Sequence, residues 1–189
     1  MSYQEANLKG VYLFTPKIFE DSRGHFFESF RVDSALKEIG QDFQVAQVNN
    51  SLSSKGVLRG IHFQQQPSAQ GKFVSVQTGS IYDVAVDLRK GSPTFGEWQG
   101  FFLSASNKQS IFLSRGIGHA FLSLEEKTQV SYLCDAPFNP INERSIHPLS
   151  LAIDWRDIAS QNDIGDFSMS EKDRIAPEFD KYSGPLFGF

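Results

Sequence analysis

One short stretch of the chain carries ionisable side chains where apolar ones would be expected. Arg59, His62 and Gln64 lie in the segment 56–64 and Lys72 follows closely, all surrounded by apolar residues and glycines. Burying a base, an amide and two cations costs free energy unless they find partners or serve a site. A lone histidine here would be interpreted as a core residue satisfied by hydrogen bonds. With Arg59 and Lys72 close by, the stretch indicates a functional site.

Strand geometry sets a condition for this site. Arg59 and His62 are an odd number of residues apart, so on a regular strand they point to opposite faces, whereas His62 and Gln64 share one face. We therefore predict a bulge or bend near Gly60 that brings Arg59 and His62 into one pocket.

Proton transfer is the chemistry that suits the candidate residues. A histidine can take a proton from carbon if a cation stabilises the enolate, and a tyrosine on the opposite side can return the proton. A carboxylate behind the histidine fixes its tautomer. Each of these residue types also has an ordinary structural interpretation: the tyrosine as an aromatic at the barrel rim, the aspartate as a helix cap, and the lysine as a solvated surface charge. Only their combination favours catalysis. The candidates are His62, His119, Tyr132, Lys72, Arg59 and Asp173.

Other site chemistries lack their motifs. Barrel proteins of the cupin kind bind metal through His-x-His and a nearby Glu, but the matching place here is His62-Phe63-Gln64, so we predict no metal. No Gly-x-Ser-x-Gly precedes a helix, and no glycine-rich dinucleotide fingerprint occurs. His25 beside a turn and His147 before a proline are expected to be solvated and receive no role.

Composition limits the class of protein. The 189 residues, 40% of them hydrophobic, suffice for one globular domain, which we assign to residues 1–189. The single cysteine, Cys134, excludes an internal disulfide framework and favours a reducing cytoplasm. With a net charge of −4, no leader and no long apolar run, we expect neither nucleic-acid nor membrane binding.

The elements that must position these residues are mostly strands. From residue 43 onward, short alternating runs punctuated by glycines predict an all-β sandwich or closed barrel. We predict a helix over 33–39 capped by Asp33, a strand-like segment ending at Trp155, and a helical turn capped by Ser170. The tail 182–189 is expected to be weakly ordered or an interface strand. Asp83 and Asp87 interrupt an apolar strand, so each needs a partner such as Arg89, Lys72 or a histidine.

Several motifs together resemble one known family, the dTDP-4-dehydrorhamnose 3,5-epimerases, from about residue 10 to 176. Each motif alone is weak, and the combination is specific. They are Asp21-Ser-Arg-Gly-His-Phe-Phe-Glu28, Gly56-Val-Leu-Arg-Gly-Ile-His-Phe-Gln64, Gln70-Gly-Lys72, Asp83-Val-Ala-Val-Asp87, Ser92-Pro-Thr-Phe-Gly96, Gly118-His-Ala-Phe121 and Ile153-Asp-Trp155.

The resemblance implies a cupin-like jelly-roll barrel with a few short helices, working without cofactor or metal as a homodimer on a nucleotide-bound 4-keto-6-deoxyhexose. The barrel would span about 43–155, the strands at 10–30 would lie at the dimer interface, and 156–189 would pack over the barrel. By resemblance, His62 is the general base, Asp173 its partner, Tyr132 the general acid, and Lys72 the enolate-stabilising lysine. The substrate-binding positions are Arg23, Glu28, Gln47, Asn49, Arg59, His119, Phe138, Glu143 and Lys172, with Arg23 and Glu28 supplied by the partner subunit.

The chain departs from the family pattern beside the expected nucleotide site. Phe138 stands where a tyrosine is common, which preserves stacking but removes a hydroxyl, and Val48 replaces a common aspartate. These departures leave two alternatives to epimerisation at C3 and C5. One is a C3-only epimerase of a related nucleotide deoxysugar, and the other is a metal-binding cupin.

Overall fold

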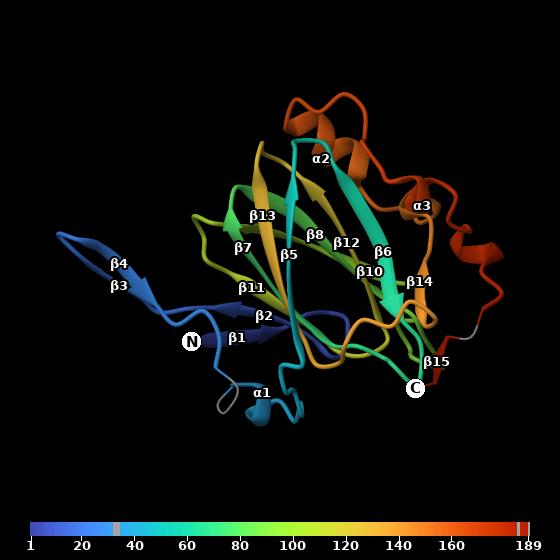
Figure 1. The fold of residues 1–189 in the computed structure, drawn as a ribbon, viewed down its shortest axis with the longest axis horizontal. Helices are drawn as coiled ribbons and strands as arrows, with labels where there is room; N and C mark the ends of the chain where they lie inside the picture. Colours follow the sequence, from blue (N-terminus) through green and yellow to red (C-terminus); the bar gives the residue numbers. More distant parts are fainter. Residues whose placement is uncertain (32–34, 185, 189) are drawn as a thin grey trace.

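Two antiparallel sheets face each other in the computed structural model, which describes residues 1–31, 35–184 and 186–188 (Figure 1). The six-stranded sheet runs β1 (Ser2–Glu5), β2 (Val11–Thr15), β11 (Ser110–Leu113), β7 (Lys72–Thr78), β13 (Thr128–Cys134) and β5 (Gln47–Ser53). The five-stranded sheet runs β10 (Trp98–Ser104), β8 (Ser80–Asp87), β12 (Ile117–Ser123), β6 (Leu58–Gln64) and β14 (Glu143–Ser145). The predicted all-β jelly-roll barrel is confirmed. Since β1 and β2 belong to its six-stranded sheet, the barrel begins earlier in the chain than residue 43.

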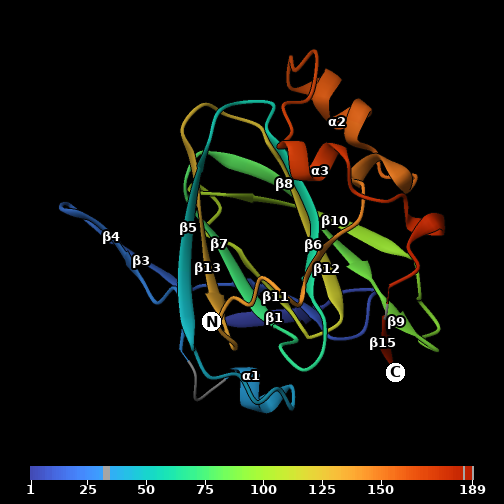
Figure 2. The same cartoon turned by 45° about the vertical axis from the view of Figure 1, so that its right-hand side comes forward.

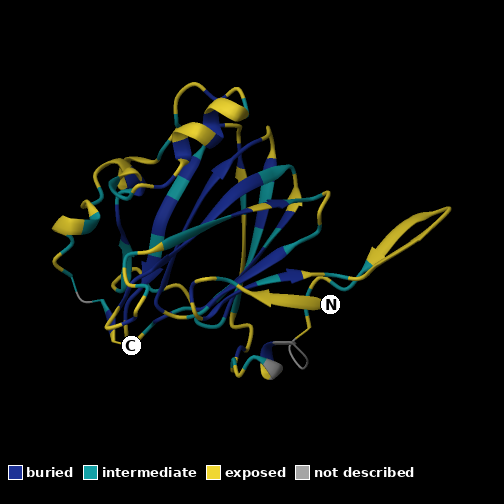
Figure 3. Ribbon diagram, turned by 180° about the vertical axis from the view of Figure 1, so that it is seen from behind, coloured by how far each residue is buried: buried dark blue, intermediate teal, exposed yellow. Residues whose placement is uncertain are grey.

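The space between the sheets is filled by aliphatic side chains. Val74 and Ile111 from the six-stranded sheet pack in one cluster with Ala85 and Phe121 from the five-stranded sheet. Because β8 and β12 are covered on both faces, their residues are buried almost without alternation (Figure 3). This packing fixes the two sheets relative to each other, and therefore fixes every side chain that points between them.

Short helices cover the outer faces of the barrel (Figure 2). Trp155 and Ile158 of α2 (Trp155–Gln161) pack with Val84 and Leu122 on the outside of the five-stranded sheet. Leu36 of α1 (Ala35–Glu38) packs in an aromatic cluster on the six-stranded sheet. The remaining helical segments are α3 (Glu171–Arg174) and the 3-10 turns η1 (Pro148–Ser150) and η2 (Phe179–Lys181). None of the described helices is long and apolar enough to cross a membrane.

Two predictions about local elements were wrong, and one helix prediction is only partly testable. Trp155 begins α2 instead of ending a strand, and it is buried with its indole N–H donated to the Pro148 carbonyl oxygen at 3.0 Å. The end of the tail is not loose: β15 (Phe187–Gly188) pairs in parallel with β9 (Arg89–Lys90) of the same chain. The first helix ends at Glu38 and a turn follows it to Gly40, which has a positive φ of 72°, while its proposed cap, Asp33, lies outside the described residues.

One hairpin stands away from the barrel. β3 (Ile18–Asp21) and β4 (Gly24–Phe27) pair only with each other and project from the six-stranded sheet (Figure 1). Their residues are almost all exposed, including Phe19 and Phe26 (Figure 3). A lone two-stranded ribbon with exposed aromatics is marginally stable in water, so this hairpin needs a surface to pack on.

The predicted irregularity at Gly60 is confirmed. Strand β6 pairs with β12 through His62 opposite His119 and Arg59 opposite Phe121, so two residues of β6 face one residue of β12. Gly60 adopts φ 113°, and a Cβ there would lie 2.5 Å from the His119 carbonyl oxygen. Only glycine fits, and the resulting bulge turns Arg59 and His62 toward one cavity.

Candidate active site

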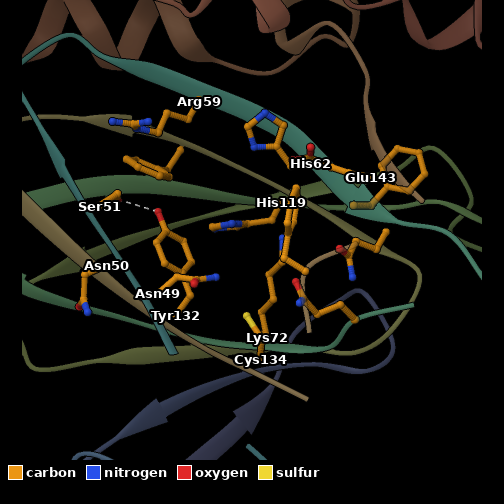
Figure 4. A pocket seen from close by; sticks show the side chains of 15 residues that line it. Asn49, Asn50, Ser51, Arg59, His62, Lys72, His119, Tyr132, Cys134 and Glu143 are labelled. Carbon is orange, nitrogen blue, oxygen red and sulfur yellow. Dashed lines mark hydrogen bonds between the residues drawn. The ribbon is translucent and has the colours of Figure 1, made fainter. Parts of the chain in front are cut away.

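A cavity opens between the two sheets at one end of the barrel, with a volume of about 250 Å³, close to the lower end for small-molecule sites (Figure 4). Strands of both sheets contribute polar side chains to it, which would be unfavourable in a plain sandwich core. The polar lining residues are Asn49, Asn50, Ser51, Arg59, His62, Gln64, Gln70, Lys72, His119, Tyr132 and Glu143, with Cys134, Phe63, Phe121 and Phe138 beside them.

His62 is held by a carboxylate from outside the barrel. Its Nε2 lies 2.6 Å from Oδ1 of Asp173, although the two residues are 111 positions apart in the chain. The His62 side chain is 30% exposed and that of Asp173 only 2%. The pair thus combines a ring accessible from the cavity with a carboxylate that solvent cannot reach, an arrangement that fixes the tautomer and orientation of the imidazole.

The position of Asp173 follows from local sequence. Ser170 caps α3 by accepting a hydrogen bond at its Oγ from the Asp173 backbone N–H at 3.2 Å, as predicted. Burial acts to raise the pKa of Asp173, but hydrogen bonds from His62, Ser170 and the Gly60 N–H outweigh it and hold the pKa below its usual value. Asp173 is therefore an anion in the neutral range.

Tyr132 lies across the cavity from His62, on the opposite sheet (Figure 4). Its hydroxyl lies 2.9 Å from Ser51 Oγ on the neighbouring strand β5, and its ring packs edge-on against His119 at 6.0 Å between centroids. Burial raises the pKa of Tyr132 to about 12. The phenol therefore remains protonated throughout the neutral range and is a proton donor, not a base.

His119 belongs to a second, deeper pair. Its Nε2 lies 2.6 Å from Oδ2 of Asp83 on β8, and both side chains are almost fully buried. Asp87, the other carboxylate of this strand, is held by Arg89 and two hydroxyls, which lower its pKa to about 2 despite its burial. The prediction that both strand carboxylates need partners is confirmed, with a histidine serving one and Arg89 the other.

Lys72 reaches the cavity from β7, beside Cys134 of β13, its direct register partner (Figure 4). Burial lowers the pKa of Lys72, while the nearby Cys134, Glu143 and Asp83 act in the opposite direction. A desolvated ammonium of this kind interacts strongly with any negative charge that forms in the cavity.

The amides and the arginine occupy the side of the cavity nearest β5. Arg59 donates from Nε to Ser53 Oγ at 3.1 Å and from Nη2 to the Leu52 carbonyl oxygen at 3.3 Å, which orients its guanidinium. Gln47 donates to Asn49 Oδ1 at 2.7 Å, and Asn49 lines the cavity. Gln47 itself is not among the lining residues, but its side-chain Oε1 accepts a hydrogen bond from the Phe138 backbone N–H at 2.7 Å.

Glu143 and Lys172 close another side. Glu143, on β14, lines the cavity and forms an ion pair with Lys172 of α3 at 2.6 Å. Phe138 also lines the cavity and is 51% exposed. Most of the predicted site residues, from segments far apart in the sequence, therefore gather around one cavity.

Known proteins are similar to this chain in sequence and in architecture over nearly its whole length. A family profile described as dTDP-4-dehydrorhamnose 3,5-epimerase matches residues 5–181. The chain belongs to the dTDP-4-dehydrorhamnose 3,5-epimerase family. The 3,5-epimerase of Mycolicibacterium smegmatis is 40% identical over 177 residues, covering 94% of this chain and 85% of that protein.

Two further relatives mark the range of activities in the family. The dTDP-4-dehydrorhamnose 3-epimerase of Streptomyces niveus is 40% identical over 157 residues, covering 82% of this chain and 76% of that protein. The solved structure of dTDP-6-deoxy-D-glucose-3,5-epimerase from Legionella pneumophila, in complex with dTDP-4-keto-L-rhamnose, matches with a TM-score of 0.91. It is 38% identical to this chain and covers 100% of it and 98% of the Legionella chain.

Two of the predicted site residues of this epimerase-family chain lie away from the cavity. Arg23 is in the projecting hairpin and forms an ion pair with Asp21 at 2.7 Å. Glu28 follows the same hairpin and lies 3.5 Å from Arg31. Within one chain, neither is among the residues that line the cavity.

Some residues of the epimerase-family site were not predicted. Ser51, the partner of the Tyr132 hydroxyl, shares a strand face with Asn49, so strand alternation could have identified it. Gln70 and Cys134 also line the cavity, and only the strand register reveals this. Within residues 1–31, 35–184 and 186–188, no three His, Cys, Asp or Glu side chains gather closely enough to hold a metal ion.

Proposed function

We propose that this chain epimerises a nucleotide-bound 4-keto-6-deoxyhexose, converting dTDP-4-dehydro-6-deoxy-D-glucose to dTDP-4-dehydro-L-rhamnose by inverting C3 and C5. The observation that carries the proposal is the placement of the His62–Asp173 pair across one cavity from the Tyr132 phenol, with Lys72 beside them. Inverting a carbon centre needs a base and an acid on opposite faces of the same substrate. The named family supplies the substrate class.

The reaction divides into two balanced proton transfers at each carbon. The 4-keto group acidifies the neighbouring C–H, and His62 takes that proton while the electron pair moves onto the ketone oxygen. The ammonium of Lys72 stabilises the enolate oxygen, since a charge in a desolvated cavity interacts strongly. Tyr132 then donates its phenolic proton to the opposite face of the carbon, and the ketone re-forms. Before the next inversion His62 gives its proton to solvent and the Tyr132 phenolate takes one from solvent, which restores both groups.

The remaining predicted residues bind the nucleotide sugar in this proposal. Arg59 contacts the diphosphate, because a guanidinium offers paired donors to phosphate oxygens. Phe138 offers a half-exposed ring on which a base can stack. Asn49, Gln47, His119, Glu143 and Lys172 surround the same ligand.

We also propose that the protein works as a homodimer in the cytoplasm, on a small-molecule substrate and without nucleic-acid or membrane binding. The hairpin β3–β4 supports the dimer, because it projects from the barrel and presents Phe19 and Phe26 with 53% and 70% of their surface exposed. In the dimer, Arg23 and Glu28 reach the cavity of the second copy. Light scattering of the pure protein measures the oligomeric state. If the protein were a monomer, Arg23 and Glu28 would not belong to the site.

A second candidate function is inversion at C3 alone. It is favoured by the Streptomyces niveus 3-epimerase, which is 40% identical to this chain over 157 residues, and by the change of the common tyrosine to Phe138.

Deuterium incorporation tests both functions. The protein is incubated in heavy water with dTDP-4-keto-6-deoxyglucose, and uptake at C3 and C5 is followed by proton NMR together with the configuration of the product. Uptake and inversion at both carbons is the expected result. Uptake at C3 alone would establish the C3 epimerase, and uptake at neither carbon would remove epimerisation altogether.

A further inference from the structure

Gln64 is a buried amide with two side-chain hydrogen bonds to the loop that carries Phe138 and one to the Ser68 carbonyl. Its side chain lies on the strand face shared with His62, and the residue is only 4% exposed. Nε2 donates to the Ser68 carbonyl oxygen at 2.8 Å and to the Pro137 carbonyl oxygen at 3.2 Å. Oε1 accepts from the Asn139 backbone N–H at 2.6 Å. Both donors and the acceptor are used, so this amide has one defined orientation.

The contacts of Gln64 bracket Phe138. The residue before Phe138 is held through its carbonyl oxygen, and the residue after it through its N–H. The N–H of Phe138 itself donates to Oε1 of Gln47 at 2.7 Å. Three consecutive backbone units are therefore fixed by two glutamine side chains from two different sheets, β6 and β5.

The same loop is tied down again beyond Phe138. Asn139 and Asn142 both donate from Nδ2 to Ser68 Oγ, at 3.1 and 3.0 Å. The Glu143 N–H donates to the Asn139 carbonyl oxygen at 2.9 Å. The loop fixed by Gln64 thus presents the Phe138 ring at one end and begins β14, with the Glu143 carboxylate, at the other.

We propose that Gln64 is a positioning residue for nucleotide affinity, which acts through Phe138 by holding its ring ready for stacking before the ligand arrives. The proposal rests on the function proposed above. When a loop becomes ordered only on binding, the lost conformational entropy of its residues weakens the affinity. Gln64 avoids this cost because it orders the loop before the ligand binds. The Gln64 side chain bonds to Ser68, Pro137 and Asn139, and not to His62 or Asp173, which bond to each other. Its effect therefore falls on binding and not on proton transfer.

Gln64→Met tests this inference, since methionine has a similar length and cannot form the three hydrogen bonds. The Kd for dTDP, measured by calorimetry, and the KM for the nucleotide sugar should rise about tenfold or more, with kcat within about threefold of the unaltered protein. Gln65→Met is the matched control. Gln65 directly follows β6, is 5% exposed, and donates from its side chain to the Tyr182 hydroxyl at 2.6 Å. It should lower the melting temperature without changing the Kd for dTDP.

A double-mutant cycle shows whether Gln64 acts through Phe138. Phe138→Ala should weaken dTDP binding, and adding Gln64→Met to it should weaken binding by less than about twofold more. The inference would be overturned if the losses in dTDP affinity of the two single variants simply added in the double variant. It would also be overturned if a folded Gln64→Met bound dTDP with a normal Kd. In both cases, continued turnover would leave the proposed function standing. Absence of dTDP binding by the unaltered protein would overturn both.

Discussion

Two histidine–carboxylate pairs stand side by side in this barrel, and they differ in what surrounds them. His62 and His119 are direct neighbours across β6 and β12, and each holds a carboxylate oxygen at 2.6 Å. The His62 ring is 30% exposed, whereas His119 is 5% exposed. The same chemical pair is therefore placed once with an exposed ring in the cavity and once almost fully buried at the cavity wall.

The carboxylates differ as much as the rings. Asp173 is also stabilised by the Ser170 side chain and the Gly60 backbone N–H. Asp83 has only His119, and among the described residues its Oδ1 finds no hydrogen-bond partner. A carboxylate with several partners tolerates changes in the charge of its histidine, and one with a single partner does not. We infer that the first pair suits repeated proton transfer and the second suits a fixed arrangement.

The largest expected effect is the loss of turnover when His62, the histidine of the exposed pair, is removed. His62→Ala should lower kcat by about 10³-fold, since general base catalysis contributes about 10²–10⁴-fold, and the Kd for dTDP should change by less than about threefold. Initial rates of deuterium exchange and calorimetry measure the two quantities. His147→Ala is the control, because His147 lies outside the cavity and caps η1. Near-normal turnover in His62→Ala would show that another group is the base.

Those parts of the site that depend on local pattern could be predicted from the sequence. The odd spacing of Arg59 and His62 required an irregular strand, and Gly60 is the residue that allows it. The Ser170 cap placed Asp173 on a short helical turn, although its approach to His62 came from the family resemblance. The helix at Trp155 was missed despite the helical spacing of Trp155 and Ile158, because the apolar run before it resembles a strand.

The parts that could not be predicted depend on strand register. A buried Asp83 required a partner, but nothing local distinguishes His119 from Lys72 as that partner. Gln64 was interpreted as a replacement for a metal ligand, while its actual partners at Pro137 and Asn139 lie 73 and 75 residues further along the chain. Such contacts arise only when two sheets are assembled, and no periodicity in a single segment records them.

The second-largest expected effect is on stability, where the loss of His119 should cost more than the loss of His62. His119→Ala should lower the free energy of unfolding by about 3–5 kcal/mol, because it leaves the buried Asp83 carboxylate without a partner. His62→Ala should cost less, about 1–2 kcal/mol, because Asp173 keeps its other hydrogen bonds. Urea unfolding of both variants measures this difference. Adding Asp83→Asn to His119→Ala should recover part of the loss by removing the orphaned charge, and equal losses in the two single variants would contradict the distinction.

The smallest effect concerns acid stability and the Asp173 carboxylate. The folded protein holds the pKa of Asp173 below its unfolded value of about 3.9, since the hydrogen bonds of the anion outweigh burial. Its contribution to the free energy of unfolding is therefore fully present above that unfolded pKa, and it is lost as the pH falls through the lower folded value. Asp173→Asn should flatten the decline of stability between about pH 5 and pH 2, measured by urea unfolding at each pH. Asp42→Asn, at an exposed loop position, should leave that decline unchanged. An unchanged slope in Asp173→Asn would mean that the carboxylate gains nothing from its partners on folding, and the two pairs would then differ only in the exposure of their rings.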